Sequence, residues 1–500
     1  MKKIIALLLA VVMVAALFAG CTDDKKPTDP ATDAPTEAPT EAPTEAPTDE
    51  ATEPGEIVEL HWYMVGNKQP DNYDAWKANL DKYLEEKIGV HLDVHIIGWD
   101  AWDNTRSTMI NTNEPFDIMF TNMGTFASDV RTGAFATIDE LAEVAPELYN
   151  FIPADYWDAC KINGSLYAVP TYKDSSITEY FVYDKALVEE VYPDYANVHD
   201  LAGVTEILKA MKEKTGSAPF ILNNNGLDAI MGNKYDGIGA GLPTLGVSYF
   251  GDEAKVVSVF EQEDVMNELK IVYQWMQDGL INEDAAILGE APNYRPAFVA
   301  QGWSYAAVST WGPNMGVDAV AVQFGDTVLS NDSVQGSMNC ISASSEHKVE
   351  ALKLLELVNT DSYVRDALYF GLEGDNFEYT AEGRVHKNTE KTWDMAGYTQ
   401  GSFFTVTMLD TEEVNQWDEV KALNAAATGS PALGFVFDTT DVTDQLANCT
   451  EIWKRYKSEL LTGTIEPEAA VAEMMEEMRA AGFDEIVTEA QTQIDAWKNA

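Results

Sequence analysis

The sequence predicts an α/β protein with two lobes, preceded by an export segment and a tether. Three observations lead to this prediction. Strand and helix patterns alternate from residue 57 onward, 500 residues suffice for two cores, and a tight turn separates two α/β stretches. An apolar content of 46% and a charged content of 23% are typical of globular proteins, so we expect most of the chain to fold.

The first 20 residues have the pattern of a bacterial signal peptide. Lys2 and Lys3 precede an apolar run over residues 4–18, which is too short to span a bilayer comfortably. The following Ala19-Gly20-Cys21 resembles a lipobox, with Phe18 where leucine is common. We expect lipidation of Cys21, for instance with palmitate, and anchoring on the outer face of the cell membrane. A plain secretory signal is the alternative.

Residues 21–56 are expected to be a disordered tether. Ala-Pro-Thr followed by an acidic residue occurs four times between Ala34 and Asp49. Such a segment has almost no apolar surface to bury, and its prolines favour an extended chain. At about 3.1 Å per residue it would reach on the order of 100 Å, which would hold a globular body away from the membrane.

The charge balance excludes some partners. The chain has 83 acidic and 32 basic residues, for a net charge of −51. Such a surface repels nucleic acid and anionic membranes and disfavours a polyanionic ligand. No glycine-rich nucleotide-binding loop is present, so a Rossmann cofactor role is disfavoured.

Cysteines form no evident metal site or disulfide framework. Apart from Cys21, the chain has Cys160, Cys340 and Cys449, and no pair has metal-ligand spacing. Buried thiols are favoured, because free cysteine packs as a small hydrophobe. One disulfide plus a free thiol is the open alternative.

The first lobe is expected over residues 57–171, as strand, helix, strand, helix, strand. Expected strands are 56–65, 90–97 and 116–120. Expected helices are 74–87 and one that follows Trp102 and ends near residue 111. Gly89 is expected to end the first helix. Because this order implies parallel strands, a ligand would lie beyond their carboxyl ends, near residues 65–68, 98–102 and 121–124.

The passage to the second lobe is expected near Asn163-Gly164, a hairpin signal because both residues tolerate positive φ. We expect the second lobe over 172–306, a return to the first lobe over 307–370, and the second lobe with C-terminal helices over 371–500. Expected strands are 166–169, 177–183, 219–222 and 304–309. Expected helices are 184–191, 200–214, 263–277, 346–359, 448–461, 467–481 and 485–499. Residues 369–379 are expected to be a loop, and residues 433–438 a strand or an extended turn.

Several segments together resemble the oligosaccharide-type lipoprotein branch of ABC-importer solute-binding proteins. They are Trp99-Asp100, Phe116-Asp117-Ile118, Asn163 to Pro170 followed by Tyr172, Tyr369 to Tyr379, Gly434 to Asp438, and the ending Ala480 to Gln493. The resemblance implies a two-lobed, type II periplasmic-binding-protein-like fold, with mixed sheets flanked by helices and a ligand cleft between the lobes. It also implies hinge closure, a membrane permease as partner, no cofactor and no catalysis.

The expected function is therefore capture of a neutral solute, a sugar or oligosaccharide, for delivery to an ABC permease by a monomeric protein. A secreted glycoside hydrolase is one alternative, with Asp100, Asp117 and Glu373 among the acids that could form a carboxylate pair. A protein that presents its ligand to a sensor is another.

Ligand contacts are expected from aromatic and amide side chains at strand ends and lobe crossings. Aromatic rings stack on the apolar faces of sugars, and amides and carboxylates bond their hydroxyls. The expected residues are Trp99, Trp102, Asn122, Tyr172, Trp303, Trp311 and Trp393, with Asp100 and Glu373 as hydroxyl acceptors. Packing at a helix start is the alternative role of Trp99 and Trp102.

No metal requirement is expected. His91 and His95 lie four residues apart on one predicted strand, so they share a face but are about 13 Å apart, too far to bind one ion. The acid-rich run over 438–444 lacks the spacing of a calcium loop. A chelator should leave the ligand affinity unchanged.

Overall fold

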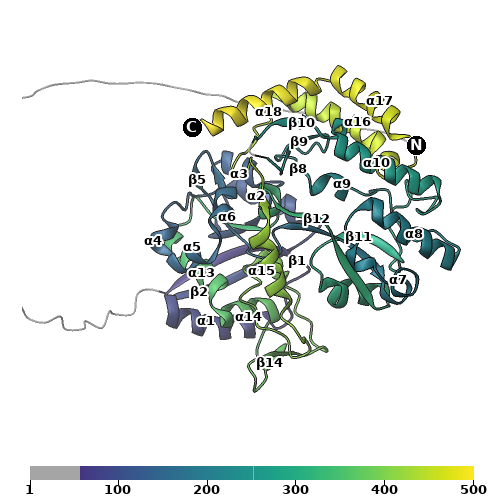
Figure 1. The fold of residues 1–500 in the computed structure, drawn as a ribbon. Helices are drawn as coiled ribbons and strands as arrows, with labels where there is room; N and C mark the ends of the chain where they lie inside the picture. The colour runs from purple at the N-terminus through teal and green to yellow at the C-terminus, as the bar shows by residue number, and fades with distance from the viewer. Residues whose placement is uncertain (1–56, 252, 500) are drawn as a thin grey trace, which may run out of the picture. The chain divides into compact units, whose positions relative to one another are not determined.

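The structure is a computed structural model that describes residues 57–251 and 253–499. The predicted signal peptide, Cys21 and the tether lie outside the described residues. The chain forms two lobes, each built on its own mixed sheet (Figure 1). Each lobe has a large hydrophobic core, to which several separate stretches of the chain contribute. None of the helices in the described part has the length and apolar character needed to cross a membrane.

The first lobe is built on a five-stranded sheet. Its order is β2 (Val90–Gly98), β1 (Val58–Gly66), β3 (Ile118–Thr121), β13 (Met338–Ile341) and β6 (Ala168–Pro170). β2, β1 and β3 are parallel, as predicted, and β13 runs antiparallel to both of its neighbours. Alternation along β1 buries Leu60, Trp62 and Met64 completely, whereas His61 and Tyr63 are half-buried on the opposite face.

Helices cover both faces of this sheet. They are α1 (Tyr73–Ile88), α2 (Trp102–Thr112), α3 (Phe126–Arg131), α4 (Leu141–Val144), α5 (Pro146–Phe151), α6 (Ala154–Ala159), α13 (Lys348–Thr360) and α14 (Ser362–Phe370). Trp76 and Leu84 of α1 are buried in the first core. α1 ends at Gly89, whose φ of 69° is the left-handed conformation that glycine adopts without strain.

The second lobe is built on a four-stranded sheet, a three-stranded sheet and a layer of helices. The first has the order β11 (Ala297–Gln301), β7 (Ile177–Asp184), β12 (Ala319–Leu329) and β16 (Thr428–Gly429), and the second β10 (Val256–Ser258), β9 (Leu245–Ser248) and β8 (Tyr235–Asp236). The helices are α7 (Lys185–Val191), α8 (Leu201–Thr215), α9 (Ala229–Gly232), α10 (Glu263–Gln277), α16 (Thr443–Leu461), α17 (Pro467–Ala480) and α18 (Phe483–Lys498). The last three, yellow in Figure 1, pack together with α10 against this core.

The chain first crosses between the lobes where the hairpin signal predicted. β4 (Lys161–Ile162) and β5 (Ser165–Leu166) form the hairpin, with φ of 52° at Asn163 and 84° at Gly164. β6 then closes the first sheet, and β7 begins the second after residues 171–176.

The predicted boundaries of the later crossings are corrected by the strand pairing. β12 pairs antiparallel with β7, so the return to the first lobe follows residue 329 and not residue 307. Met395 belongs to the first core, and Tyr398 and Phe404 pack against it, so this lobe extends well beyond residue 370. The chain resumes the second sheet only at β16, after α15 (Gln416–Ala426).

The strand predicted over 304–309 is also wrong. The carboxylate of Glu419 accepts from the backbone N–H groups of Ser304 and Tyr305, at 2.7 and 3.1 Å. N–H groups bound in this way resemble those of a capped helix start, and the chain continues into a π-helical turn at Ala307–Trp311 and into α11 (Gly312–Met315). Residues 219–222 form no strand, and Phe220 makes two isolated bridges, to Ile281 and to Ala297.

Cys160, Cys340 and Cys449 are buried free thiols, which confirms the favoured alternative. The Sγ of Cys160 lies 3.7 Å from the sulfur of Met338, inside the first core. Burial raises the pKa of all three thiols, so they remain protonated and unreactive at neutral pH.

Candidate functional site

A cleft of about 660 Å³ opens chiefly in the second lobe and reaches Asp332, which follows the return of the chain to the first lobe. It is lined by residues from the start of β7, the end of β11, the irregular segment over 221–245, and α12 (Asn331–Val334). Its polar lining consists chiefly of Glu179, Asn223, Asp228, Tyr235, Arg295, Gln301 and Asp332. A cleft of this size with several convergent polar groups is typical of a small-ligand site.

Carboxylates give the cleft its acidic character. Burial raises the pKa of Glu179 to about 7, and repulsion from the neighbouring Asp228 adds to the rise. Burial, with repulsion from Asp236, raises the pKa of Asp332 to about 6. Burial likewise raises the pKa of Asp228. These carboxylates are thus poorly hydrated acceptors, and they disfavour an anionic ligand.

Arg295 is the cationic group that lines this acidic cleft. Its guanidinium carbon lies 3.6 Å from the centre of the Phe298 ring, so the plane of the cation is held on an aromatic face. Its Nε is buried and has no hydrogen-bond partner. Burial lowers the pKa of Arg295. A buried donor without a partner is costly, and a ligand oxygen would relieve this cost.

Besides the cleft, an exposed aromatic side chain lies at the carboxyl ends of the strands of the first lobe. Trp99 follows β2, is 52% exposed, and donates from Nε1 to Asn67 Oδ1 at 3.0 Å. Its ring stacks against that of Tyr398, with centroids 6.1 Å apart and planes 17° apart. The ring is therefore held in place while much of it stays open to solvent. Met123, after β3, is 55% exposed.

A narrower cavity of about 210 Å³ links the two lobes. It is lined by Met123 and Gly124 after β3, by Arg131, and by residues of the second lobe such as Phe435. Asp332 lines both this cavity and the larger cleft. The carboxyl end of β3 therefore lies next to the cleft, as expected for a parallel sheet.

The structure separates the predicted ligand residues into accessible and buried groups. Trp99, Asp100 and Glu373 are exposed, and Asn122 is half-buried, with its Oδ1 accepting from Gly124 N–H at 3.0 Å. Trp102 is only 6% exposed.

The remaining predicted aromatic residues are held by protein contacts. Tyr172 is 3% exposed and packs edge-on against Phe404. Trp102 packs against Phe120, so neither Tyr172 nor Trp102 presents a free ring face, and their prediction as ligand contacts is corrected to core packing.

Three tryptophans are half-buried and held by contacts with neighbouring segments. Trp303 donates to Gln416 Oε1 and packs against Trp417, Trp311 packs against Tyr180, and Trp393 donates to the carbonyl of Leu368. None of the nine predicted residues lines the 660 Å³ cleft.

Sequence reasoning missed the residues that do line it. Glu179 is followed in its strand by four apolar or aromatic residues over 180–183, and Arg295 stands just before another apolar strand. A charged residue in or beside an apolar strand was the available signal, because such a group is rarely buried without a reason.

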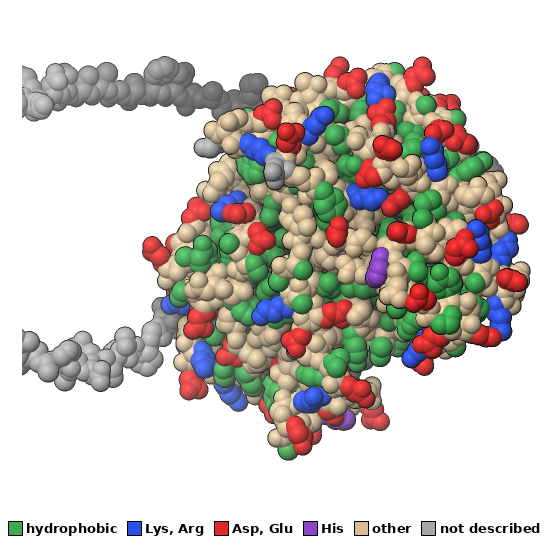
Figure 2. Space-filling model, in the orientation of Figure 1, with side chains coloured by type: hydrophobic (Ala, Val, Ile, Leu, Met, Phe, Trp, Pro, Cys, Tyr) green, Lys and Arg blue, Asp and Glu red, His purple; other side chains and the backbone are tan. Residues whose placement is uncertain are grey.

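The surface agrees with the charge balance. Figure 2 shows acidic side chains spread over the visible face, with lysine and arginine scattered between them and no basic patch on that face. A nucleic-acid-binding surface would need clustered basic side chains.

Comparison with known proteins places the chain among transport proteins. The family described as bacterial extracellular solute-binding protein matches residues 78–370, and one described as domain of unknown function (DUF3502) matches residues 431–499. A carbohydrate ABC transporter substrate-binding protein of Streptococcus pneumoniae serotype 4 (strain ATCC BAA-334 / TIGR4) is 27% identical over 472 residues, covering 89% of this chain and 92% of that protein.

Solved structures are similar over nearly the whole described chain. The crystal structure of the N-glycan transport solute binding protein NgtS from Streptococcus pneumoniae has a TM-score of 0.78 at 25% identity, covering 88% of this chain and 98% of that one. NgtS in complex with Man5GlcNAc has a TM-score of 0.64 at 25% identity, covering 88% and 99%.

Proposed function

The chain belongs to the bacterial extracellular solute-binding proteins, and on this basis we propose that it captures a neutral oligosaccharide and delivers it to an ABC permease. Members of this family are non-enzymatic transport components, which confirms the expectation that the protein is not an enzyme. The glycoside hydrolase alternative is thereby set aside.

The observation that carries the proposal is the chemistry of the 660 Å³ cleft. Glu179, Asp228 and Asp332 can accept hydrogen bonds from sugar hydroxyls, and the unpartnered Nε of Arg295 can donate to a ring or hydroxyl oxygen. The same three carboxylates repel an acidic sugar. A neutral ligand with many hydroxyl groups can donate to these carboxylates and accept from Arg295 at the same time.

Relatives support an oligosaccharide as the ligand. The curated relative is described as a carbohydrate ABC transporter substrate-binding protein, and the similar structure of NgtS was solved with Man5GlcNAc. We take oligosaccharides of mannose and N-acetylglucosamine as the first ligands to test. We propose that Trp99, whose ring stacks on that of Tyr398, contacts one face of a sugar when the lobes close.

Hinge closure is the proposed response to the ligand. The TM-score falls from 0.78 against the NgtS structure whose description names no ligand to 0.64 against the Man5GlcNAc complex, as a change in the angle between two lobes would produce. We propose that the described conformation is the open form. The hinge would include residues 171–176, where Asn424 accepts from the N–H and hydroxyl of Ser176, at 3.1 and 2.8 Å.

The anchored arrangement is part of the same proposal. Cys21 would carry the lipid, residues 22–56 would act as the stalk, and a monomeric body would move between solvent and permease. The motif at Ala19-Gly20-Cys21 and the proline-rich repeats support this arrangement.

A thermal-shift screen of the purified protein tests the proposal. The panel should hold neutral oligosaccharides of mannose and N-acetylglucosamine, the same sizes bearing uronic acids, and short peptides. A ligand that binds only the folded state raises the melting temperature. A selective shift with neutral sugars and no product formed is expected. A shift with peptides alone would overturn the oligosaccharide assignment, and sugar cleavage would overturn the transport role.

A further inference from the structure

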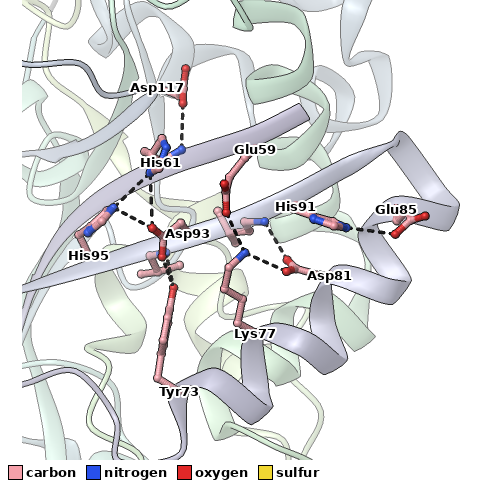
Figure 3. Close-up of polar contacts among 12 residues, drawn as sticks. Glu59, His61, Tyr73, Lys77, Asp81, Glu85, His91, Asp93, His95 and Asp117 are labelled. Carbon is pink, nitrogen blue, oxygen red and sulfur yellow. Dashed lines mark hydrogen bonds and ion pairs between the residues drawn. The ribbon is translucent and has the colours of Figure 1, made fainter. Parts of the chain in front are cut away.

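Two histidines and an aspartate meet on the half-exposed face of β1 and β2. The parallel register sets His61 of β1 opposite Asp93 of β2, and His95 follows two residues later on the same face. His61 Nδ1 lies 3.3 Å from His95 Nε2 and 3.5 Å from Asp93 Oδ2, and His95 Nε2 lies 3.3 Å from the same oxygen (Figure 3). Three donor atoms therefore form a nearly equilateral triangle.

This triangle has the size of one face of a zinc coordination tetrahedron. Zinc binds imidazole nitrogen and carboxylate oxygen at about 2.0–2.2 Å, and a tetrahedron with bonds near 2.05 Å has edges of about 3.3–3.4 Å. Two imidazoles and one carboxylate are also a common ligand set for divalent transition metals. We propose that His61, Asp93 and His95 bind a divalent transition metal ion, with zinc as the best fit and the fourth position open to solvent.

Hydrogen bonding alone does not account for the three contacts. Two neutral imidazoles offer at most one proton each, and the carboxylate offers none. If both facing nitrogens carry protons, the contact between His61 and His95 sets two donors against each other. If only one does, its single proton must serve two acceptors. A cation at the centre is approached by all three lone pairs at once.

Surrounding groups hold the three ligands in this orientation. The hydroxyl of Tyr73 donates to Asp93 Oδ1 at 2.8 Å, which leaves Oδ2 for the metal. The Tyr63 ring stacks on His95, with centroids 4.2 Å apart and planes 13° apart. Hydrogen bonds and packing of this kind fix the orientation of metal ligands and tune affinity.

The site is accessible and its chemistry suits a cation. The side chains of His61, Asp93 and His95 are 42%, 28% and 32% exposed, so an ion can enter from solvent. Two imidazole nitrogens and a carboxylate oxygen are donor atoms that divalent transition metals accept.

His91 provides a matched control on the same strand. It lies on the same face as His95, but its Nε2 is 3.1 Å from Glu85 Oε2, away from the triangle (Figure 3). Within a single strand, the sequence offers only the pair His91 and His95 as neighbouring histidines. The partner that completes the triangle comes from the neighbouring strand.

Titration of the chelator-treated, metal-free protein with zinc chloride, followed by calorimetry, tests the proposal. We expect one saturable equivalent in the unaltered protein and in His91→Ala, and a loss of affinity of at least about 100-fold in His61→Ala and His95→Ala. Substitution of Co²⁺ should give the intense visible absorption of a tetrahedral site, which the two ligand variants should lack.

Two outcomes would overturn the proposal. One is the absence of saturable binding in the unaltered protein. The other is equal zinc affinity in His95→Ala and in the unaltered protein. Asp93→Asn, which keeps the side-chain volume, serves as a second ligand variant if either alanine variant fails to fold, and it should lose affinity as they do. The result does not depend on oligosaccharide binding, since none of the three residues lines the cleft.

Discussion

Tyr73 and Asp93 are joined by a 2.8 Å hydrogen bond that connects the start of α1 to the edge strand of the first sheet. The same hydroxyl accepts from the Val94 N–H at 2.6 Å, and Asp81 accepts from the Leu92 N–H at 2.9 Å. The N–H groups of Leu92 and Val94 in β2 are thus bound by side chains of α1, and that of Ile96 is bound by Gln69, which precedes this helix. An edge strand covered in this way cannot pair with another chain.

Replacing Tyr73 by phenylalanine should therefore destabilise the first lobe. Tyr73→Phe leaves the Val94 N–H and Asp93 Oδ1 without their partner, so the free energy of unfolding should fall by about 1–3 kcal/mol. Urea denaturation measures this change. Tyr63→Phe is the control. Tyr63 lies on β1, and this variant should leave the free energy of unfolding almost unchanged. Equal stability of both variants would contradict the role of the Tyr73 hydroxyl.

Trp99 and Trp102 should respond in opposite ways to alanine. Trp99 is largely exposed, so Trp99→Ala should weaken oligosaccharide binding by about 10-fold or more, with little loss of stability. Trp102 is buried, so Trp102→Ala should lower the free energy of unfolding by about 3–5 kcal/mol. Chemical denaturation and calorimetric binding distinguish the two effects. Unchanged affinity in Trp99→Ala would remove this residue from the proposed site.

Arg295 should matter for the ligand more than for the fold. Arg295→Met keeps much of the packing on Phe298 but removes the donor, so oligosaccharide affinity should fall by about 10- to 100-fold. Stability should change little or rise, because the buried Nε has no partner in the free protein. Arg455→Met, on the exposed surface of α16, is the matched control. An equal loss of affinity in both variants would show that the loss comes from the changed net charge of the protein and not from the donor of Arg295.

Glu179 should make stability depend on pH in a defined direction. Burial raises its pKa to about 7 in the folded protein, against an ordinary value of 4.5. The folded state therefore holds the proton more tightly, and stability falls as pH rises from about 4.5 through 7. Above pH 7 the buried anion costs on the order of 1–3 kcal/mol.

The Glu179→Gln variant isolates this contribution. It should be more stable than the unaltered protein at pH 8, and the difference should vanish near pH 4.5, where both side chains are neutral. Melting temperatures at the two pH values give the answer. An equal difference at both values would show that ionisation of Glu179 is not its cause.

Removing metal with a chelator should affect the proposed zinc site but not the oligosaccharide site. If zinc binds at His61, Asp93 and His95, a chelator should lower the melting temperature, because the ion links β1 to the edge strand β2. Oligosaccharide affinity should stay unchanged, since none of the three proposed metal ligands lines the cleft. Loss of sugar binding on chelation would contradict the predicted independence of the ligand site from metal.

Elements with a strong local signal were predictable. The helix over residues 263–277 was predicted to the residue, because apolar residues recur at helical spacing and Gly279 follows its end. The hairpin at Asn163-Gly164 was predicted because few residues adopt positive φ in succession. The residues over 304–309 were mistaken for a strand, because the carboxylate that holds their N–H groups belongs to Glu419, more than a hundred positions away.

The sequence by itself determined the α/β class, the two cores, the order of most helices and the resemblance to a solute-binding family, since these depend on local periodicity and on contiguous motifs. Tertiary structure alone decided which side chains meet. Strand register brought His61 to His95, and lobe packing buried Trp102 while leaving Trp99 exposed. Pairing between distant strands and burial in a shared core depend on the whole chain, so no local pattern reports them.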